Sequence, residues 1–118
     1  MGDKLMRIDS RTVGDVHILD CSGKITLGMG TMAVRNSIRD VLKMGGRKII
    51  LNLADVNYID SSGVGELVST YTTVINQGGQ LKLLSLTRKI EEILAITKLL
   101  TVFQVYDSEM ETVDSFGG

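Results

Sequence analysis

The sequence has 118 residues, of which 43% are hydrophobic and 23% are charged, and this is the size and balance of one globular domain with its own core. Thirteen basic and 14 acidic residues give a net charge of −1, and three Tyr, two Phe and no Trp provide few stacking rings, which argues against a general nucleic-acid binder. The lack of a signal pattern and of an apolar run long enough to cross a bilayer predicts a cytoplasmic domain with no membrane attachment, and a single histidine, His17, with a single cysteine, Cys21, excludes a His/Cys zinc cluster and an internal disulfide.

The first half of the chain predicts a hairpin, a helix and a buried strand. Met6–Val13 and Val16–Cys21 have strand character and are separated by a Gly-Asp pair, which favours a β-hairpin. After a glycine-rich connection over 23–30, the apolar residues of Thr31–Met44 recur at helical spacing, and two glycines follow. The β-branched run Lys48–Leu53 then predicts a strand that is buried on both faces.

The second half of the chain alternates helices with strands. A strong amphipathic pattern begins near Asp60–Ser62 and stops at Gly78-Gly79, which predicts a helix. After it we expect a strand at Gln80–Leu84 and a capped helix from Thr87. A last strand at Thr101–Tyr106 and a short capped helix from Ser108 should follow.

The resulting order β-β-α-β-α-β-α-β-α predicts one α/β domain over 1–118, with a core over about 4–116. Strands that alternate with helices need crossover connections, so the sheet should be mostly parallel. The hairpin adds an antiparallel strand. We therefore expect a mixed, mostly parallel sheet with an N-terminal β-hairpin and about four helices.

A run of polar and small residues, Asp60-Ser61-Ser62-Gly63-Val64-Gly65, falls where the buried strand leads into the second helix. Asp and Ser side chains accept hydrogen bonds from the free N–H groups of a helix start. Capping accounts for any one of these residues alone, but two serines followed by alternating glycines exceed what a cap requires. The glycines keep the first turn slim enough for a partner surface to approach. The run predicts an exposed hydroxyl at the positive end of a helix dipole.

This run resembles the signature of STAS domains, the anti-sigma factor antagonists of bacterial partner-switching systems. The preceding segment 48–59 and the later segments 78–83 and 99–103 also match the pattern of the family. The resemblance covers nearly the whole chain and agrees with the order of elements. It implies a single STAS domain that acts as a switch rather than as an enzyme.

The resemblance also implies which residues carry the switch. In such antagonists the serine directly after the motif Asp is phosphorylated by a kinase that is also an anti-sigma factor, and the unphosphorylated antagonist captures that kinase and frees the sigma factor. The matching position is Ser61, and Ser62 is the second candidate because its hydroxyl lies one residue away. The partner-binding residues expected on this basis are Asp60, Ser61, Ser62, Gly63, Val64, Gly65, Lys24 and Thr26.

Lys24 departs from the pattern of the family. The sporulation-type antagonists tend to carry acidic residues just after the glycine that follows the second strand, whereas this chain reads Gly23-Lys24-Ile25-Thr26-Leu27. A lysine there implies a different complementary surface on the partner. Alternatively, it implies a scaffold or ligand-sensing STAS module in a signalling complex without sigma-factor release.

An enzyme is a third interpretation, and the sequence supports it least. Ser61 as a nucleophile needs a base, and His17 lies in a predicted strand near the N-terminus. The nucleophile elbow needs a glycine two residues before the serine, where an isoleucine stands. Asp55, Asp60 and Glu66 suggest a magnesium site, but Asp60 has a capping role and Asp55 could end its strand in a turn. We expect no catalytic residue, no metal and no cofactor.

A basic stripe, formed by Arg35, Arg39 and Lys43, recurs at i, i+4 and i+8 on the first predicted helix. Like charges at this spacing mildly destabilise an isolated helix. The simpler interpretation is a solvated face whose charges pair with acids elsewhere. A binding stripe is the alternative, and it would favour an acidic partner surface.

Overall fold

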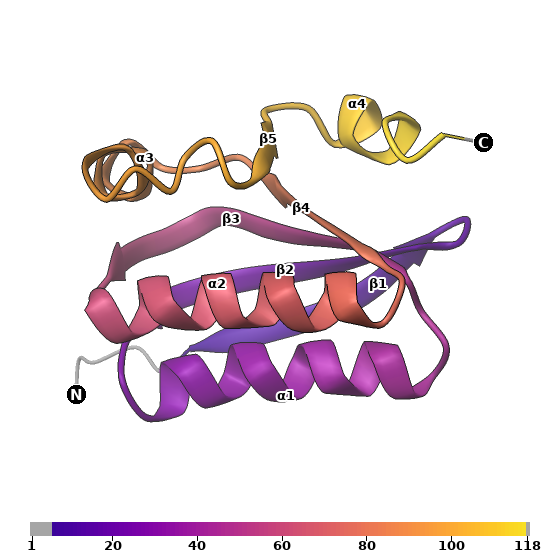
Figure 1. The fold of residues 1–118 in the computed structure, drawn as a ribbon, viewed down its shortest axis with the longest axis horizontal. Coiled ribbons are helices and arrows are strands. Elements are labelled where there is room, and N and C mark those ends of the chain that lie inside the picture. The colour runs from indigo at the N-terminus through magenta and orange to yellow at the C-terminus, as the bar shows by residue number, and fades with distance from the viewer. Residues whose placement is uncertain (1–5, 118) are drawn as a thin grey trace.

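The computed structural model describes residues 6–117, which form a five-stranded sheet with two helices over each face (Figure 1). The strands are β1 Arg7–Val13, β2 Val16–Ile25, β3 Lys48–Ile59, β4 Gln80–Leu84 and β5 Gln104–Tyr106. The helices are α1 Met29–Lys43, α2 Ser61–Asn76, α3 Arg88–Ile96 and α4 Glu109–Asp114. Within this part of the chain, no helix combines the length and the apolar character needed to span a membrane.

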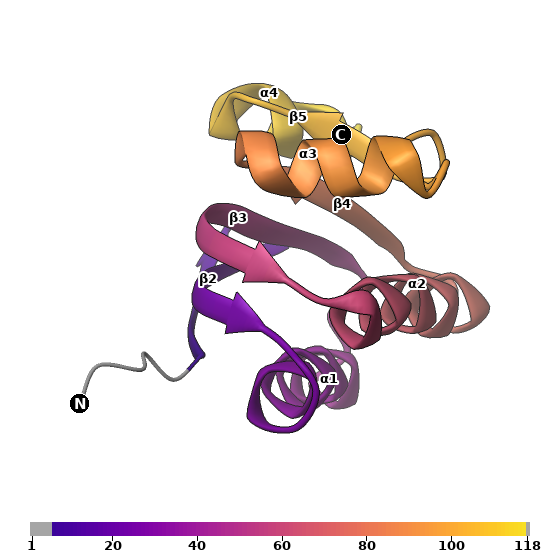
Figure 2. The same cartoon turned by 90° about the vertical axis from the view of Figure 1, so that its left-hand side faces the viewer.

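The strands lie in the sheet in the order of the chain. β1 pairs with β2 antiparallel, and the pairs from β2 to β5 are all parallel. Helices α1 and α2 pack side by side on one face of the sheet, and α3 and α4 lie over the other (Figure 2). The predicted α/β class with a mixed, mostly parallel sheet and an N-terminal hairpin is confirmed. The core predicted over about 4–116 begins at Lys4, which lies outside the described residues.

β3 forms the centre of the core, as predicted for a strand buried on both faces. Ile49, Ile50 and Leu51 each have 0% of their surface exposed. Ile49 and Leu51 belong to a large cluster that α1 and α2 cover. Ile50 belongs to a smaller cluster on the opposite face, which Phe116 closes after α4. Because successive side chains of a strand point to opposite faces, this one strand joins the two halves of the core.

Two strands are longer than predicted, and their extra length carries the chain to the Asp60 turn. β2 continues past Cys21 to Ile25, and β3 continues through 54–59 to Ile59, where the two strands still pair. The pairing in this region passes two register shifts, and only Val56 and Ile59 of residues 54–59 are buried. A search for continuous apolar runs misses such a strand, because only one face of it is covered here.

The remaining boundaries differ in smaller ways. α1 begins at Met29 rather than at Thr31, since the carbonyl of Gly28 already accepts the N–H of Met32 at 3.0 Å. The last strand covers only Gln104–Tyr106 instead of 101–106. Phe103 is 5% exposed, so it reaches the core from a turn and needs no strand pairing.

Arg11 ties the N-terminal hairpin to α4. Its guanidinium binds the carboxylate of Asp20 on β2 at 2.6 Å and that of Glu109 on α4 at 2.7 Å. The hydrogen bonds from Arg11 lower the pKa of both carboxyl groups, and they raise the pKa of Arg11 itself. The cluster therefore contributes most to stability while both acids are ionised.

The stabilisation that Arg11 provides should decrease in acid, and the variant Arg11→Met should lack this pH-dependent stabilisation. Because the folded-state pKa values of Asp20 and Glu109 are lowered, their contribution is fully present above the unfolded values of about 4 and is lost as the pH falls below them. We expect Arg11→Met to be less stable than the parent at pH 7, with the difference shrinking towards pH 3. Urea midpoints measured across this range test it, and parallel pH curves for the two proteins would contradict it.

Candidate functional site

The turn between β3 and α2 is held by the side chain of Asp60, which caps α2. The backbone of Asp60 is extended, with φ −101° and ψ −176°, and its Oδ1 accepts the N–H of Gly63 at 2.8 Å. Its Oδ2 accepts the N–H of Leu27 at 3.1 Å. One carboxylate thus joins the start of α2 to the loop that follows β2.

These backbone donors also fix the charge of the capping residue. The N–H of Gly63 is the largest influence that lowers the pKa of the Asp60 carboxyl, and the N–H groups of Leu27 and Ser62 add to it. Hydrogen bonds to the ionised form favour that form. At neutral pH the turn therefore carries a negative charge directly beside Ser61.

The two serines of the motif differ in exposure. Ser61 is the first residue of α2 and is exposed, whereas Ser62 is half-buried. Neither hydroxyl forms a hydrogen bond with another residue between 6 and 117. The more accessible hydroxyl, that of Ser61, stands at the end of the helix where free N–H groups create a positive potential.

The glycines near this turn differ in whether a close backbone contact requires them. A Cβ atom on Gly63 would lie 2.1 Å from the carbonyl oxygen of Ile25, and one on Gly30 would lie 2.5 Å from the carbonyl oxygen of Lys24. Both α1 and α2 therefore begin against the last residues of β2, and only glycine allows this approach. A Cβ on Gly65 would meet nothing within 4 Å, so the fold gives no reason for a glycine at that exposed position.

The other residues expected to bind a partner are not equally accessible. Lys24 is exposed and Thr26 is half-buried at the end of β2. Val64 is 8% exposed and packs into the large core cluster, and Gly63 is buried. The accessible surface of the motif consists of Ser61, Gly65 and parts of Asp60 and Ser62.

Two large apolar residues are exposed at this site. Leu27 is 77% exposed and Met29 is 63% exposed, and both lie in the segment that Asp60 holds through the N–H of Leu27. Large apolar side chains exposed together are typical of interaction surfaces. The signal in the sequence is weak, because a leucine and a methionine among glycines show no periodicity.

Glu66 has a structural role that the sequence also did not reveal. Its side chain is 4% exposed, and it accepts hydrogen bonds from Arg35 on α1 at 2.7 Å and from Thr70 at 2.9 Å. A buried carboxylate persists only when such partners compensate for its lost hydration. These contacts of Glu66 hold α1 against α2 just beyond the motif.

Within residues 6–117, no histidine lies near enough to act as a base for the hydroxyl of Ser61. The single histidine, His17, lies at the start of β2, whereas the turn adjoins its end, a separation on the order of 25 Å. The acids considered for magnesium are also not brought together: Asp55 lies within β3 rather than in a turn, and Asp60 and Glu66 are engaged as described. No group of three His, Cys, Asp or Glu residues within 6–117 could hold a metal ion.

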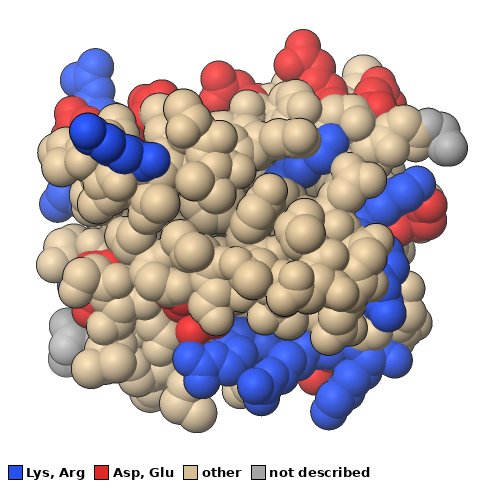
Figure 3. Space-filling view, viewed as in Figure 1, with Lys and Arg blue, Asp and Glu red and all other residues tan. Residues whose placement is uncertain are grey.

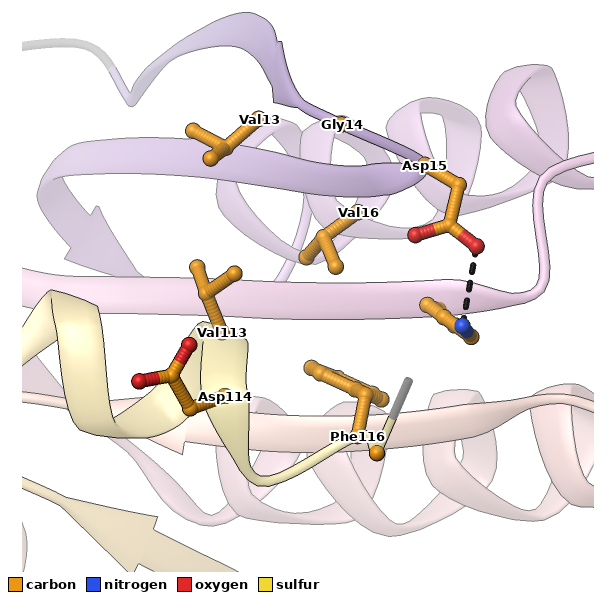
Figure 4. Close-up of a pocket in the computed structure, with 9 residues that line it drawn as sticks. Val13, Gly14, Asp15, Val16, Val113, Asp114 and Phe116 are labelled. Atoms are coloured by element: carbon orange, nitrogen blue, oxygen red, sulfur yellow. Dashed lines mark hydrogen bonds and ion pairs between the residues drawn. The ribbon is translucent and has the colours of Figure 1, made fainter.

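A hollow of about 300 Å³ lies far from the motif, between the hairpin turn and the end of α4 (Figure 4). Its walls include Val16 and Phe116, and the ammonium of Lys48 at its edge already binds the carboxylate of Asp15 at 2.8 Å. A ligand-sensing module would need such a hollow to bind its ligand. With its cation engaged, it offers a small molecule mainly apolar contact.

Comparisons with known proteins agree with this geometry. The model of the STAS domain family matches residues 7–112. A Thermotoga neapolitana protein that carries the name of an anti-sigma factor antagonist homolog is 30% identical over 92% of this chain and 96% of its own length.

Solved structures lead in the same direction. The crystal structure described as an anti-sigma factor antagonist of Thermotoga maritima superposes with a TM-score of 0.83, at 28% identity over 92% of both chains. SpoIIAA, an anti-sigma factor antagonist, has structures in an unphosphorylated and in a phosphorylated form, with TM-scores of 0.76 and 0.70. Each is 18% identical over 94% of this chain, and they cover 95% and 98% of SpoIIAA, so this likeness concerns the fold.

Proposed function

The chain belongs to the STAS domain family, and from that premise we propose that it is an anti-sigma factor antagonist whose binding is switched off by phosphorylation of Ser61. Its partner is an anti-sigma factor with serine kinase activity in the cytoplasm. The unphosphorylated chain captures this partner and thereby releases the sigma factor. The names of its relatives support the class of partner.

The observation that carries the proposal is the exposed Ser61 hydroxyl at the positive end of α2, with exposed Leu27 and Met29 close to its turn. In the kinase reaction this oxygen forms a bond to the γ-phosphorus of ATP, ADP leaves, and the hydroxyl proton is released. The chain needs no base of its own, because the kinase supplies the catalytic groups.

Phosphorylation at this position should change binding without changing the fold. A phosphate adds about −1.5 to −2 charges, and a helix N-terminus accommodates such charge. A partner seated over Leu27 and the first turn of α2 would meet added volume and a second anion beside Asp60. A misplaced charge in an interface costs several kcal/mol, and about 1.4 kcal/mol already lowers affinity tenfold.

Phosphate mapping tests the proposal directly. We expect incubation with ATP and an ATPase-type kinase encoded beside this chain's gene to place one phosphate on Ser61, and we expect Ser61→Ala to abolish most of the label. Ser62→Ala is the control, and it should keep the label because its hydroxyl is half-buried. Mass spectrometry that finds the label on Ser62, or finds no label and no kinase binding, would overturn the assignment of Ser61.

A scaffold or ligand-sensing STAS module is the second candidate function. Lys24 favours it, since an exposed lysine stands where the sporulation-type antagonists tend to be acidic. A reconstitution with kinase and sigma factor separates the two functions. Release of the sigma factor on adding the unphosphorylated chain supports the antagonist, and a stable complex of all three proteins supports the scaffold.

A further inference from the structure

A narrow groove runs between α1 and α2, beginning one turn beyond the phosphorylation motif. Its volume is about 110 Å³, with Arg35 and Arg39 on the α1 side and Ser69 and Thr73 on the α2 side. The floor includes the carboxylate of Glu66, whose two oxygens are already occupied by Arg35 and Thr70. The groove thus presents guanidinium and hydroxyl groups above an acid that is already satisfied.

The charge at this groove exceeds what the fold uses. Arg35 is paired with Glu66 at 2.7 Å, but Arg39 in the groove forms no ion pair with any residue between 6 and 117. Lys43, one turn further along α1 and outside the lining of the groove, is also without an ion pair in this part of the chain. Lys and Arg side chains gather along α1 at the lower edge of the molecule, while acidic side chains gather at the opposite edge (Figure 3). All three side chains of the basic stripe are exposed, as expected for a solvated face, but only Arg35 is paired with an acid.

The groove is continuous with the surface around Ser61. Met32 on α1 is 54% exposed and lies one turn after Met29 and one turn before Arg35, so apolar exposure passes into basic charge along a single helix face. On α2, Ser61, Gly65 and Ser69 follow at intervals of four residues and are all exposed. Small side chains let another backbone approach this stretch of α2 closely.

We infer that the groove between α1 and α2 binds an acidic segment of the same anti-sigma factor that phosphorylates Ser61. The apolar end of that segment contacts Met29 and Met32, and its carboxylates bind Arg39 and Arg35. This inference rests on the proposed function and adds the chemistry of the partner. The exposed Lys24 agrees with this inference, because Lys24 and the arginines of the groove all favour an acidic partner.

A protein partner fits better than a nucleic acid. Guanidinium groups form paired hydrogen bonds with carboxylates and with phosphates. However, the exposed methionines on the same face offer nothing to a phosphate backbone, and flexible Met side chains suit a protein surface. The net charge of −1 also opposes accumulation on nucleic acid.

The first experiment needs no identified kinase. A synthetic helical peptide with three Glu at i, i+4 and i+8 and a terminal Leu is titrated into the ¹⁵N-labelled chain. We expect saturable shifts at the amides of Arg39, Ser69 and Thr73, weakened at least about tenfold in Arg39→Glu/Lys43→Glu and by added salt. Arg88→Glu/Lys98→Glu on the α3 side is the matched control and should bind as the parent does.

Several outcomes of this titration would overturn the inference. These are the absence of shifts at millimolar peptide, shifts that map outside the groove, and equal shifts from a peptide with Lys in place of Glu. Equal shifts from a short DNA duplex would indicate general phosphate binding instead. If sedimentation shows a dimer and the groove is protected in it, the groove binds a second copy of the chain instead.

The second experiment uses the kinase that labels Ser61. We expect Arg39→Glu/Lys43→Glu to weaken its binding at least about tenfold while leaving thermal stability unchanged. If the parent binds and Ser61→Asp does not, but the double variant binds normally, the inference fails and the proposed function stands. If the parent itself neither binds nor is labelled while the peptide still maps to the groove, the proposed function fails instead.

Discussion

Replacing Gly63 by Ala is expected to destabilise the fold by about 3 kcal/mol. The new Cβ would fall 2.1 Å from the carbonyl oxygen of Ile25 and 2.5 Å from Cγ1 of Ile59. The first of these atoms belongs to the backbone of a paired strand and cannot rotate away. Relief would require α2 to move away from the end of β2, and this would also pull the N–H of Gly63 from Asp60.

The matched change, Gly65→Ala, should have the opposite sign. Its Cβ would meet nothing within 4 Å, and alanine is favoured over glycine inside a helix by about 0.5–1 kcal/mol. Urea denaturation followed by circular dichroism measures both free energies of unfolding. Equal destabilisation of the two variants would show that the first turn of α2, rather than one backbone contact, determines the cost.

The two glycines of the motif differ in whether the fold requires them. Gly63 is explained by the approach of α2 to β2. Gly65 stands exposed at a position where the fold would accept a better helix former. Of the two, only Gly65 requires a cause outside the described part of the chain, and a partner close to α2 provides one.

The order of elements was predictable because each one carries a local signal. Asp60, Thr87 and Ser108 cap their helices through the side-chain oxygens that the sequence suggested, with Gly63, Ile90 and Glu111 as the respective N–H donors. Glycine pairs end α1 and α2. The apolar run of β3 is buried as its composition indicated.

The contacts that build the site were less predictable, because they join residues distant in the chain. Nothing around Leu27 indicates that its N–H binds Asp60, 33 residues later. Likewise, Arg35 has no local sign that it pairs with Glu66. The exposure of Leu27 and Met29 depends on the extension of β2 to Ile25, which the register shifts conceal.

Ser61→Asp is expected to weaken binding of the anti-sigma factor kinase at least about 100-fold, which corresponds to about 2.7 kcal/mol. The new carboxylate would stand beside Asp60, whose charge is fixed by the N–H groups of Gly63 and Leu27. A partner seated on this turn must then desolvate two neighbouring anions. Isothermal titration calorimetry with the purified kinase measures the loss.

Two controls make that loss interpretable. Ser61→Ala should bind within about twofold of the parent, because the hydroxyl forms no hydrogen bond within residues 6–117. Ser10→Asp adds the same charge at an exposed position on β1 and should leave binding unchanged. A negative charge at a helix N-terminus is favourable, so Ser61→Asp should unfold at the same urea concentration as the parent or at a slightly higher one. Equal affinities of the Ala and Asp variants at position 61 would mean that the motif only caps α2, since a residue that faces a partner cannot accept a charge at no cost.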